Sequence, residues 1–190
     1  EERGEKHPGE GAALSLPRFL QTWQRSCRTE ESFCLALCRL QGRDEEEALQ
    51  EYLSRSREQL EHILPRGSLL GSYGSACFIL YLPGTHPQKA RQILEALPGF
   101  GSGGSGGSGK DLRAGVGYYP CLNYNRLQVT ETARMALEHA QLLSEDWIAV
   151  FDSLSLTVSA DRHYARGDLA EAIREYEQAL LLEPENQLAR

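Results

Sequence analysis

The hydrophobic positions of this chain follow two spacings, and the alternation between them predicts the order of helices and strands. Apolar residues three and four positions apart predict helices over 16–28, 44–64, 87–97 and 127–143. Short apolar runs predict strands over 32–40, 68–72, 76–82, 111–119 and 147–151. This order, with two crossover units around a hairpin, predicts an α+β fold in which helices cover one face of a partly antiparallel sheet.

From Ser153 onward the spacing is helical throughout and predicts a separate all-α segment over 153–190. This segment resembles the tetratricopeptide repeat, a helical hairpin of about 34 residues that stacks in arrays. The resemblance rests on Gly167, Ala172, Tyr176, Ala179 and Pro184. One hairpin cannot bury its own apolar face. We therefore expect it to dock on the rest of the chain or on a partner, or to be cut from a longer array.

The composition is that of an acidic globular protein. Charged residues make up 25% and hydrophobic residues 41% of the 190, and the formal net charge is −7. A nucleic-acid binder or a protein held on an anionic membrane would present a basic surface, so we expect neither kind of partner. No apolar run approaches the roughly 20 residues that a membrane span needs. Polar residues with glycine and proline predict a flexible tail over 1–13, before a domain over 14–152.

Five cysteines are spread along the chain without the spacing of a metal site. Cys34 and Cys38 lie four positions apart on one predicted strand, and Cys77 lies on another. Neither a CxxC pair nor a clustered histidine accompanies them. We therefore expect buried thiols, no bound metal and a reducing, cytoplasmic location.

Residues 101–109, GSGGSGGSG, have the composition of an engineered flexible linker that replaces a loop. A glycine-rich loop that cradles a phosphate is the alternative. That alternative requires a GxxxxGK[ST] pattern, and here Lys110 is followed by Asp111. These nine residues are therefore set aside in the functional interpretation.

Two short strands meet at a tight turn within residues 69–83, LLGSYGSACFILYLP. Gly74 can supply the positive φ that such a turn needs. The segment resembles the signature hairpin of the GGDEF family, the diguanylate cyclases, in which glycines, acidic residues and a phenylalanine precede an apolar strand. The corresponding residues here are Gly74, Ser75, Ala76, Cys77 and Phe78. The frame of the signature is kept, and its acidic residues are absent.

Further segments extend this resemblance over about 16–152. They are the opening LPRF at 16–19, the apolar strand at 35–40, AGVG at 114–117, the alanine-rich helix at 133–141 and VFD at 150–152. The resemblance implies the GGDEF palm, which has a ferredoxin-like βαββαβ core with helices packed on the sheet.

The same comparison implies that the catalytic chemistry is absent. Active members hold Mg²⁺ through acidic residues, and phosphoryl transfer needs such oxygen ligands. The first-strand metal positions correspond here to Arg39 and Gln41, and the signature acids to Ala76 and Cys77. The product-binding RxxD motif would fall at 65–68, where proline and serine replace its arginine and aspartate. We therefore expect a degenerate GGDEF domain with no metal, no cofactor and no enzyme activity.

The leading hypothesis is a non-catalytic scaffold that binds protein partners or forms a homodimer, in bacterial signalling or assembly. The alternative is a non-catalytic receptor for GTP or cyclic di-GMP, for which Arg39, Arg66 and Arg113 are the candidate phosphate contacts. A third hypothesis, an enzyme of different chemistry using Asp44 or Cys77, lacks a neighbouring base in the sequence.

Overall fold

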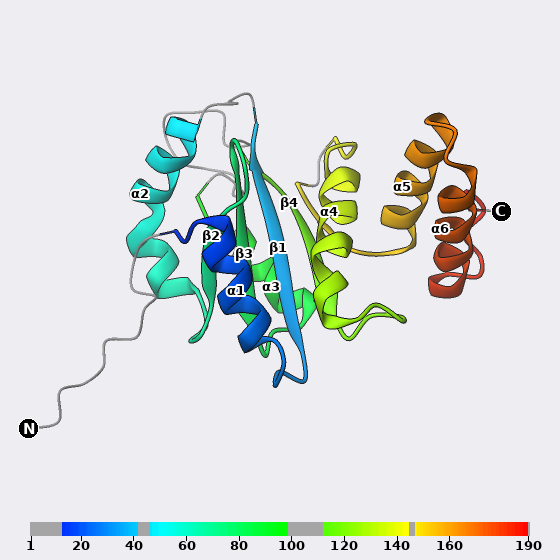
Figure 1. The fold of residues 1–190 in the computed structure, drawn as a ribbon. Coiled ribbons are helices and arrows are strands. Elements are labelled where there is room, and N and C mark those ends of the chain that lie inside the picture. The colour runs from blue at the N-terminus through cyan, green and yellow to red at the C-terminus, as the bar shows by residue number, and fades with distance from the viewer. Residues whose placement is uncertain (1–12, 42–45, 99–111, 145–146, 190) are drawn as a thin grey trace, which may run out of the picture.

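The computed structural model describes residues 13–41, 46–98, 112–144 and 147–189 (Figure 1). The helices are α1 (Leu16–Ser26), α2 (Glu46–Ile63), α3 (Pro87–Glu95), α4 (Val129–Ala140), α5 (Ser153–Ala165) and α6 (Leu169–Leu182), with a 3₁₀ turn η1 (Arg126–Gln128) before α4. The strands are β1 (Phe33–Leu40), β2 (Leu69–Ser72), β3 (Cys77–Pro83), β4 (Leu112–Tyr119) and β5 (Ile148–Val150). The predicted order of elements is confirmed. None of the helices in these ranges is long and apolar enough to cross a membrane.

The five strands form one sheet in the order β2-β3-β1-β4-β5. The pairs β2–β3, β3–β1 and β1–β4 are antiparallel, and α4 connects β4 to a parallel β5. β1, α2, β2, β3, α3 and β4 therefore form a ferredoxin-like βαββαβ unit, to which α4 and β5 add a fifth strand. The sheet places β1 at its centre, hydrogen-bonded along both edges.

Helices cover both faces of this sheet, so the prediction of helices on one face is wrong. The side chains of Cys34, Ala36 and Cys38 belong to a core with α2 and α3. The alternate residues Leu35 and Leu37 belong to a second core with α1 and α4. A strand that is apolar at every position exposes an apolar surface on each side, and each surface needs its own cover.

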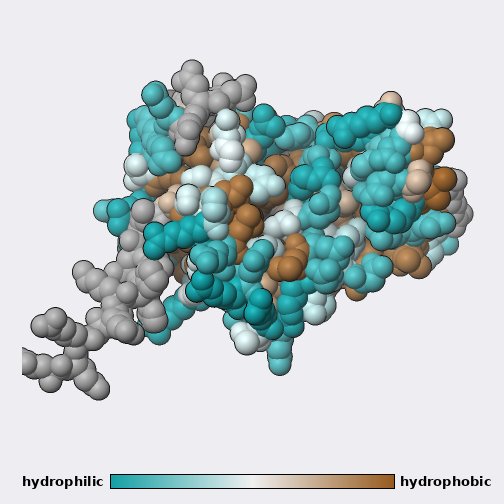
Figure 2. Space-filling model, viewed as in Figure 1, coloured by the Kyte–Doolittle hydropathy of each residue, from teal (hydrophilic) through white to brown (hydrophobic). Residues whose placement is uncertain are grey.

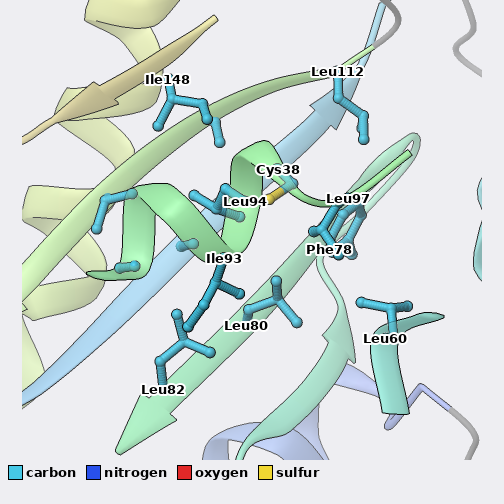
Figure 3. Packing of buried hydrophobic residues seen from close by; sticks show 14 of the residues in the cluster. Cys38, Leu60, Phe78, Leu80, Leu82, Ile93, Leu94, Leu97, Leu112 and Ile148 are labelled. Carbon is cyan, nitrogen blue, oxygen red and sulfur yellow. The ribbon is translucent and has the colours of Figure 1, made fainter. Parts of the chain in front are cut away.

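The core beneath α3 is built from side chains of several strands (Figure 3). Ile93 of α3 points toward Leu80 and Leu82 of β3, and Leu94 lies beside Cys38 of β1. Leu112 of β4 and Ile148 of β5 belong to the same cluster. Phe78 adds an aromatic contact with Tyr52 of α2, with ring centroids 5.6 Å apart. The signature phenylalanine is therefore a core residue.

Two glycines of β4 let α4 lie directly against the sheet. A Cβ on Gly115 would be 1.9 Å from the backbone nitrogen of Leu137, and one on Gly117 would be 2.4 Å from Oγ1 of Thr132. Both distances are far below a permitted contact, so only glycine fits at either position.

The two C-terminal helices pack on this domain through a third hydrophobic cluster. Met135, Ala136 and Ala140 of α4 meet Leu156 of α5 and Ala179 of α6, together with Phe151 after β5. Figure 1 shows α5 between α4 and α6. Tyr124 reinforces the contact, because its hydroxyl donates to Oε1 of Gln178 at 2.6 Å. The helix pair thus docks on the rest of the chain, which is one of the expectations from the sequence.

Several element boundaries differ from the sequence predictions. The helix predicted over 127–143 begins as η1, which Asn125 caps by accepting from the backbone nitrogens of Leu127 and Gln128, and α4 ends at Ala140. The remaining helices and strands differ by a few residues at their ends. The expectations for residues 1–12, Asp44 and 101–109 lie outside the described residues.

We predict that Gly115→Ala destabilises the protein by upwards of about 3 kcal/mol, because the backbone of α4 must move away from β4. The matched control is Gly84→Ala, whose Cβ meets nothing within 4 Å and costs only its positive φ of 59°, about 1–2 kcal/mol. Urea unfolding followed by circular dichroism measures both. Equal losses for the two variants would contradict the close approach of α4.

Candidate functional site

The signature hairpin joins β2 to β3 through residues 73–76. Gly74 has φ of 74°, as predicted, and Ala76 has a second positive φ of 56° that the sequence did not indicate. The loop is closed by the backbone nitrogen of Tyr73, which donates to the carbonyl of Cys77 at 2.9 Å. Ser75 is exposed at the tip, whereas Ala76 is fully buried. The hairpin is therefore a compact structural turn.

Strand register places Arg39 opposite Cys77 on one side and opposite Arg113 on the other. The backbone nitrogen of Leu40 donates to the carbonyl of Ala76 at 2.8 Å, which fixes the end of β1 against the turn. Gln41 follows directly after β1. The structure thus brings together the first-strand positions and the signature positions, as the resemblance implies.

Of the described residues at the first-strand and signature positions, Arg39 carries a cation and Cys77 a thiol, and none is acidic. Burial raises the pKa of the Cys77 thiol, and the charge of Arg39 acts in the opposite sense. A thiol held in its protonated form is a weak nucleophile. Over the described ranges, no group of three or more His, Cys, Asp or Glu residues is placed to hold a metal ion. Guanidinium groups cannot serve as Mg²⁺ ligands, which must be oxygen donors.

Arg113, a candidate phosphate contact, is engaged in holding the end of α4. Its guanidinium donates to the carbonyl of Ala140 and, at 2.7 Å, to the carbonyl of Leu143. It also lies 4.2 Å from the centroid of the Trp147 ring. The carbonyls at a helix C-terminus lack intrahelical partners, and a cation satisfies them well. Arg113 is therefore a structural residue in this structure.

Arg66, another candidate, lies at the opposite end of the hairpin from Arg39. It occupies an exposed turn in which the backbone nitrogen of Ser68 donates to the carbonyl of Pro65 at 3.2 Å. It borders a groove of about 910 Å³ between α2 and β2. The groove walls include Leu53, Leu60, Leu64, Leu69, Leu70, Arg57 and Glu61. The three candidate arginines therefore do not converge on one site.

The positions that resemble a tetratricopeptide repeat occupy structural places in the helix pair. Gly167 has φ of 83° in the turn between α5 and α6. Ala172 and Ala179 are buried on the face of α6. The hydroxyl of Tyr176 donates to Oδ1 of Asp161, which raises the pKa of the tyrosine to about 12. Pro184 lies in the turn after α6.

Two polar clusters of the helix pair were not anticipated. Asp152 caps α5 by accepting from the backbone nitrogen of Ser155 at 2.8 Å, and Nδ1 of His139 lies 3.2 Å from the Ser155 hydroxyl. Glu175 lies on the buried face of α6 with only 2% of its surface exposed. The sequence contains a signal for the burial of Glu175, because position 175 lies between Ala172 and Ala179 at the spacing of one helix face.

Exposed apolar side chains are concentrated on the helix pair. Of the nine large hydrophobic residues that are exposed in the described ranges, six lie between 154 and 188. They are Leu154, Tyr164, Leu169, Ile173, Leu181 and Leu188. Figure 2 shows hydrophobic side chains along the outer edge of the end formed by α5 and α6.

Comparison with known proteins places this fold beside GGDEF domains. No protein-family model and no curated protein matches the chain. Among solved structures, the GGEEF domain of a diguanylate cyclase from Vibrio cholerae has a TM-score of 0.58 at 13% identity, with 73% of this chain and 97% of that chain covered. The GGDEF domain of DgcB from Caulobacter crescentus, in complex with c-di-GMP, has a TM-score of 0.56 at 13% identity, covering 79% and 98%.

A third similar structure is diguanylate cyclase SiaD from Pseudomonas aeruginosa, in complex with its activator SiaC. It has a TM-score of 0.53 at 21% identity, and the match covers 71% of this chain and 56% of the SiaD chain. These identities establish the fold alone. This chain therefore has a GGDEF-like fold, as its sequence predicted.

We predict that Arg113→Gln lowers the free energy of unfolding by about 2 kcal/mol or more, because two carbonyls at the end of α4 lose a charged donor. Arg66→Gln is the matched control, since Arg66 is exposed, and its effect should stay within about 0.5 kcal/mol. Urea unfolding measures both. A neutral Arg113 variant would show that its guanidinium does not hold α4.

Proposed function

We propose that this chain is a non-catalytic GGDEF-type domain that, with a tetratricopeptide-like helix pair, acts as a scaffold for protein partners. The observation that carries the proposal is the concentration of exposed apolar residues at the helix pair: of the nine in the described residues, five lie on α5 and α6, and Leu188 lies in the turn after α6. Exposed apolar patches on a soluble protein mark interaction surfaces. Helix pairs of this kind bind peptides and domains on such surfaces.

The residues at the former metal positions support a non-catalytic role. Arg39 and Gln41 stand where the family has first-strand acids, and Ala76 and Cys77 stand in the signature. The register pairs Arg39 with Cys77, and by the family resemblance both are positions at which catalysis would need an acidic Mg²⁺ ligand, which supports a non-catalytic role. Restoring the chemistry would require several acidic residues at once.

A protein partner is also consistent with the known structures of this fold. SiaD is seen in complex with its activator protein SiaC, so a GGDEF-like domain can form part of a protein complex. For this chain we propose association through the outer face of α6, with a homodimer as one form that the association can take.

A receptor for GTP or cyclic di-GMP is the second candidate function. The groove beside the exposed Arg66 favours it, because a cation next to apolar walls suits a ligand with phosphates and bases. Glu61 lines the same groove and pairs with Arg57 at 3.0 Å, which leaves little net positive charge. The scaffold is therefore the better-supported function.

We predict no stabilisation by GTP, cyclic di-GMP or Mg²⁺, and no cyclic dinucleotide product. A ligand that binds only the folded state at 100 times its Kd adds about 2.7 kcal/mol, which raises the melting temperature of a chain this size by about 5–10 °C. Differential scanning fluorimetry measures the melting temperature, and chromatography of the reaction mixture detects any cyclic dinucleotide product. A shift that Arg66→Ala abolishes would favour the receptor instead, and any product would overturn both candidates.

We predict that Ile173→Glu removes partner proteins that the wild-type chain captures, because Ile173 is 58% exposed on α6 and a charge there opposes burial. The matched control is Leu127→Glu in η1, where the leucine is 52% exposed but lies outside the helix pair. Affinity capture with quantitative mass spectrometry compares the three chains. Loss of more than tenfold with Ile173→Glu alone is expected, whereas equal behaviour of the two variants would contradict the proposal.

A further inference from the structure

A series of polar groups that runs from the exposed Asp168 to the buried Glu175 links α5 to α6 and places two carboxylates around one imidazole. Nδ1 of His163 lies 3.3 Å from Oδ2 of Asp168, and Nε2 of His163 lies 3.9 Å from Oε1 of Glu175. Asp168 stands at the start of α6, where its side chain makes no capping hydrogen bond and is turned to the histidine instead. His163 comes from the last turn of α5.

When Asp168 and Glu175 are both charged, this series of polar groups has one proton too few to supply every contact with a donor. A neutral imidazole has one N–H, so it can donate to Asp168 or to Glu175 but not to both. The other ring nitrogen then directs a lone pair at a carboxylate. A proton taken up by Glu175 gives that carboxyl a donor directed at Nε2 of His163, while the imidazole N–H on Nδ1 donates to Asp168.

The missing hydrogen-bond donor destabilises the folded state most at Glu175. Glu175 is 2% exposed, and its Oε2 is fully buried without a hydrogen-bond partner. A buried carboxylate without sufficient partners destabilises the folded state. Burial raises the pKa of Glu175, while a hydrogen bond from Ser159 and the charge of His163 act in the opposite sense.

The charged groups that face Glu175 from the neighbouring elements do not supply the missing hydrogen-bond donor. From α4, Arg134 already pairs with Glu131 and Glu138, both at 2.6 Å. On α6 itself, Arg174 pairs with Glu171, whose own charge raises the pKa of Glu175 further. Tyr124, before η1, donates its hydroxyl to Gln178. From α5, only Ser159 and His163 act on the carboxylate.

We propose that Asp168, His163 and Glu175 form a proton-responsive clasp, which holds α6 more tightly on α5 when it takes up a proton. The clasp joins the two helices whose outer surface carries the exposed apolar residues, so helix-pair closure and pH are linked. It stands on contacts within the helix pair and does not depend on whether that surface binds a partner.

The direction of the pH dependence follows from the raised pKa of Glu175. A carboxyl with a higher pKa in the folded than in the unfolded state stabilises the fold fully below its unfolded pKa, near 4.5. That stabilisation is lost as the pH rises through the folded-state value. Each proton bound only in the folded state changes the unfolding constant by up to about tenfold per pH unit within that window.

The test is the unfolding constant of the full chain from pH 5 to pH 8, measured by urea titration. With Glu175→Gln, we expect a shallower pH dependence than in the wild type and greater stability at pH 8, because the amide supplies the missing donor without titrating. Hydrogen exchange of α6, corrected for intrinsic rates, should show the same change locally. The matched control is Glu177→Gln, an exposed glutamate on the same helix, which should leave the dependence unchanged.

A second variant keeps the test decisive if Glu175→Gln fails to fold. Asp168→Asn lets its amide donate to Nδ1 of His163, which frees the imidazole N–H for Glu175 and should also reduce the pH dependence. An unchanged dependence in the folded variants would overturn the clasp. So would a Glu175→Gln chain that is less stable than the wild type at pH 8.

Discussion

The two-sided burial of β1 is the constraint on which the rest of the structure depends. This strand pairs with β3 along one edge and β4 along the other, and its side chains are almost all buried. Its two apolar faces require two helical layers, which α2 and α3 supply on one side and α1 and α4 on the other. Because β1 is paired with β3 and with β4 at the same time, two strand registers together fix the position of Arg39 beside the signature turn.

The C-terminal helix pair covers a further apolar surface, which lies on the side of α4 that faces away from the sheet. α4 lies close to the sheet because Gly115 and Gly117 leave no side chain between them. Its other face presents Met135, Ala136 and Ala140, which the C-terminal helices cover. The docked pair leaves Leu169, Ile173 and Leu181 of α6 exposed, and these residues carry the proposed scaffold function. The polar groups between α5 and α6 make that attachment responsive to protons under the proposed clasp.

Much of the fold could be predicted from the sequence, because spacing reflects local backbone geometry. The order of elements and the hairpin at Gly74 both followed from local patterns. The second helical layer was missed, although the unbroken apolar run of β1 implied it. The sequence leaves Arg113 as a candidate ligand contact, because nothing near it in the sequence reveals the carbonyls of Ala140 and Leu143.

By itself, the sequence determined the helices, the strands, the GGDEF-like fold and which residue types stand at the signature positions. These depend on side-chain periodicity and on residue identity, both of which are local. Only the tertiary structure decided that Arg39 faces Cys77, that Arg66 lies apart from it, and that Glu175 is buried beside His163. Those facts depend on distances between segments remote in the chain, and such distances exist only once the sheet and its helices have packed.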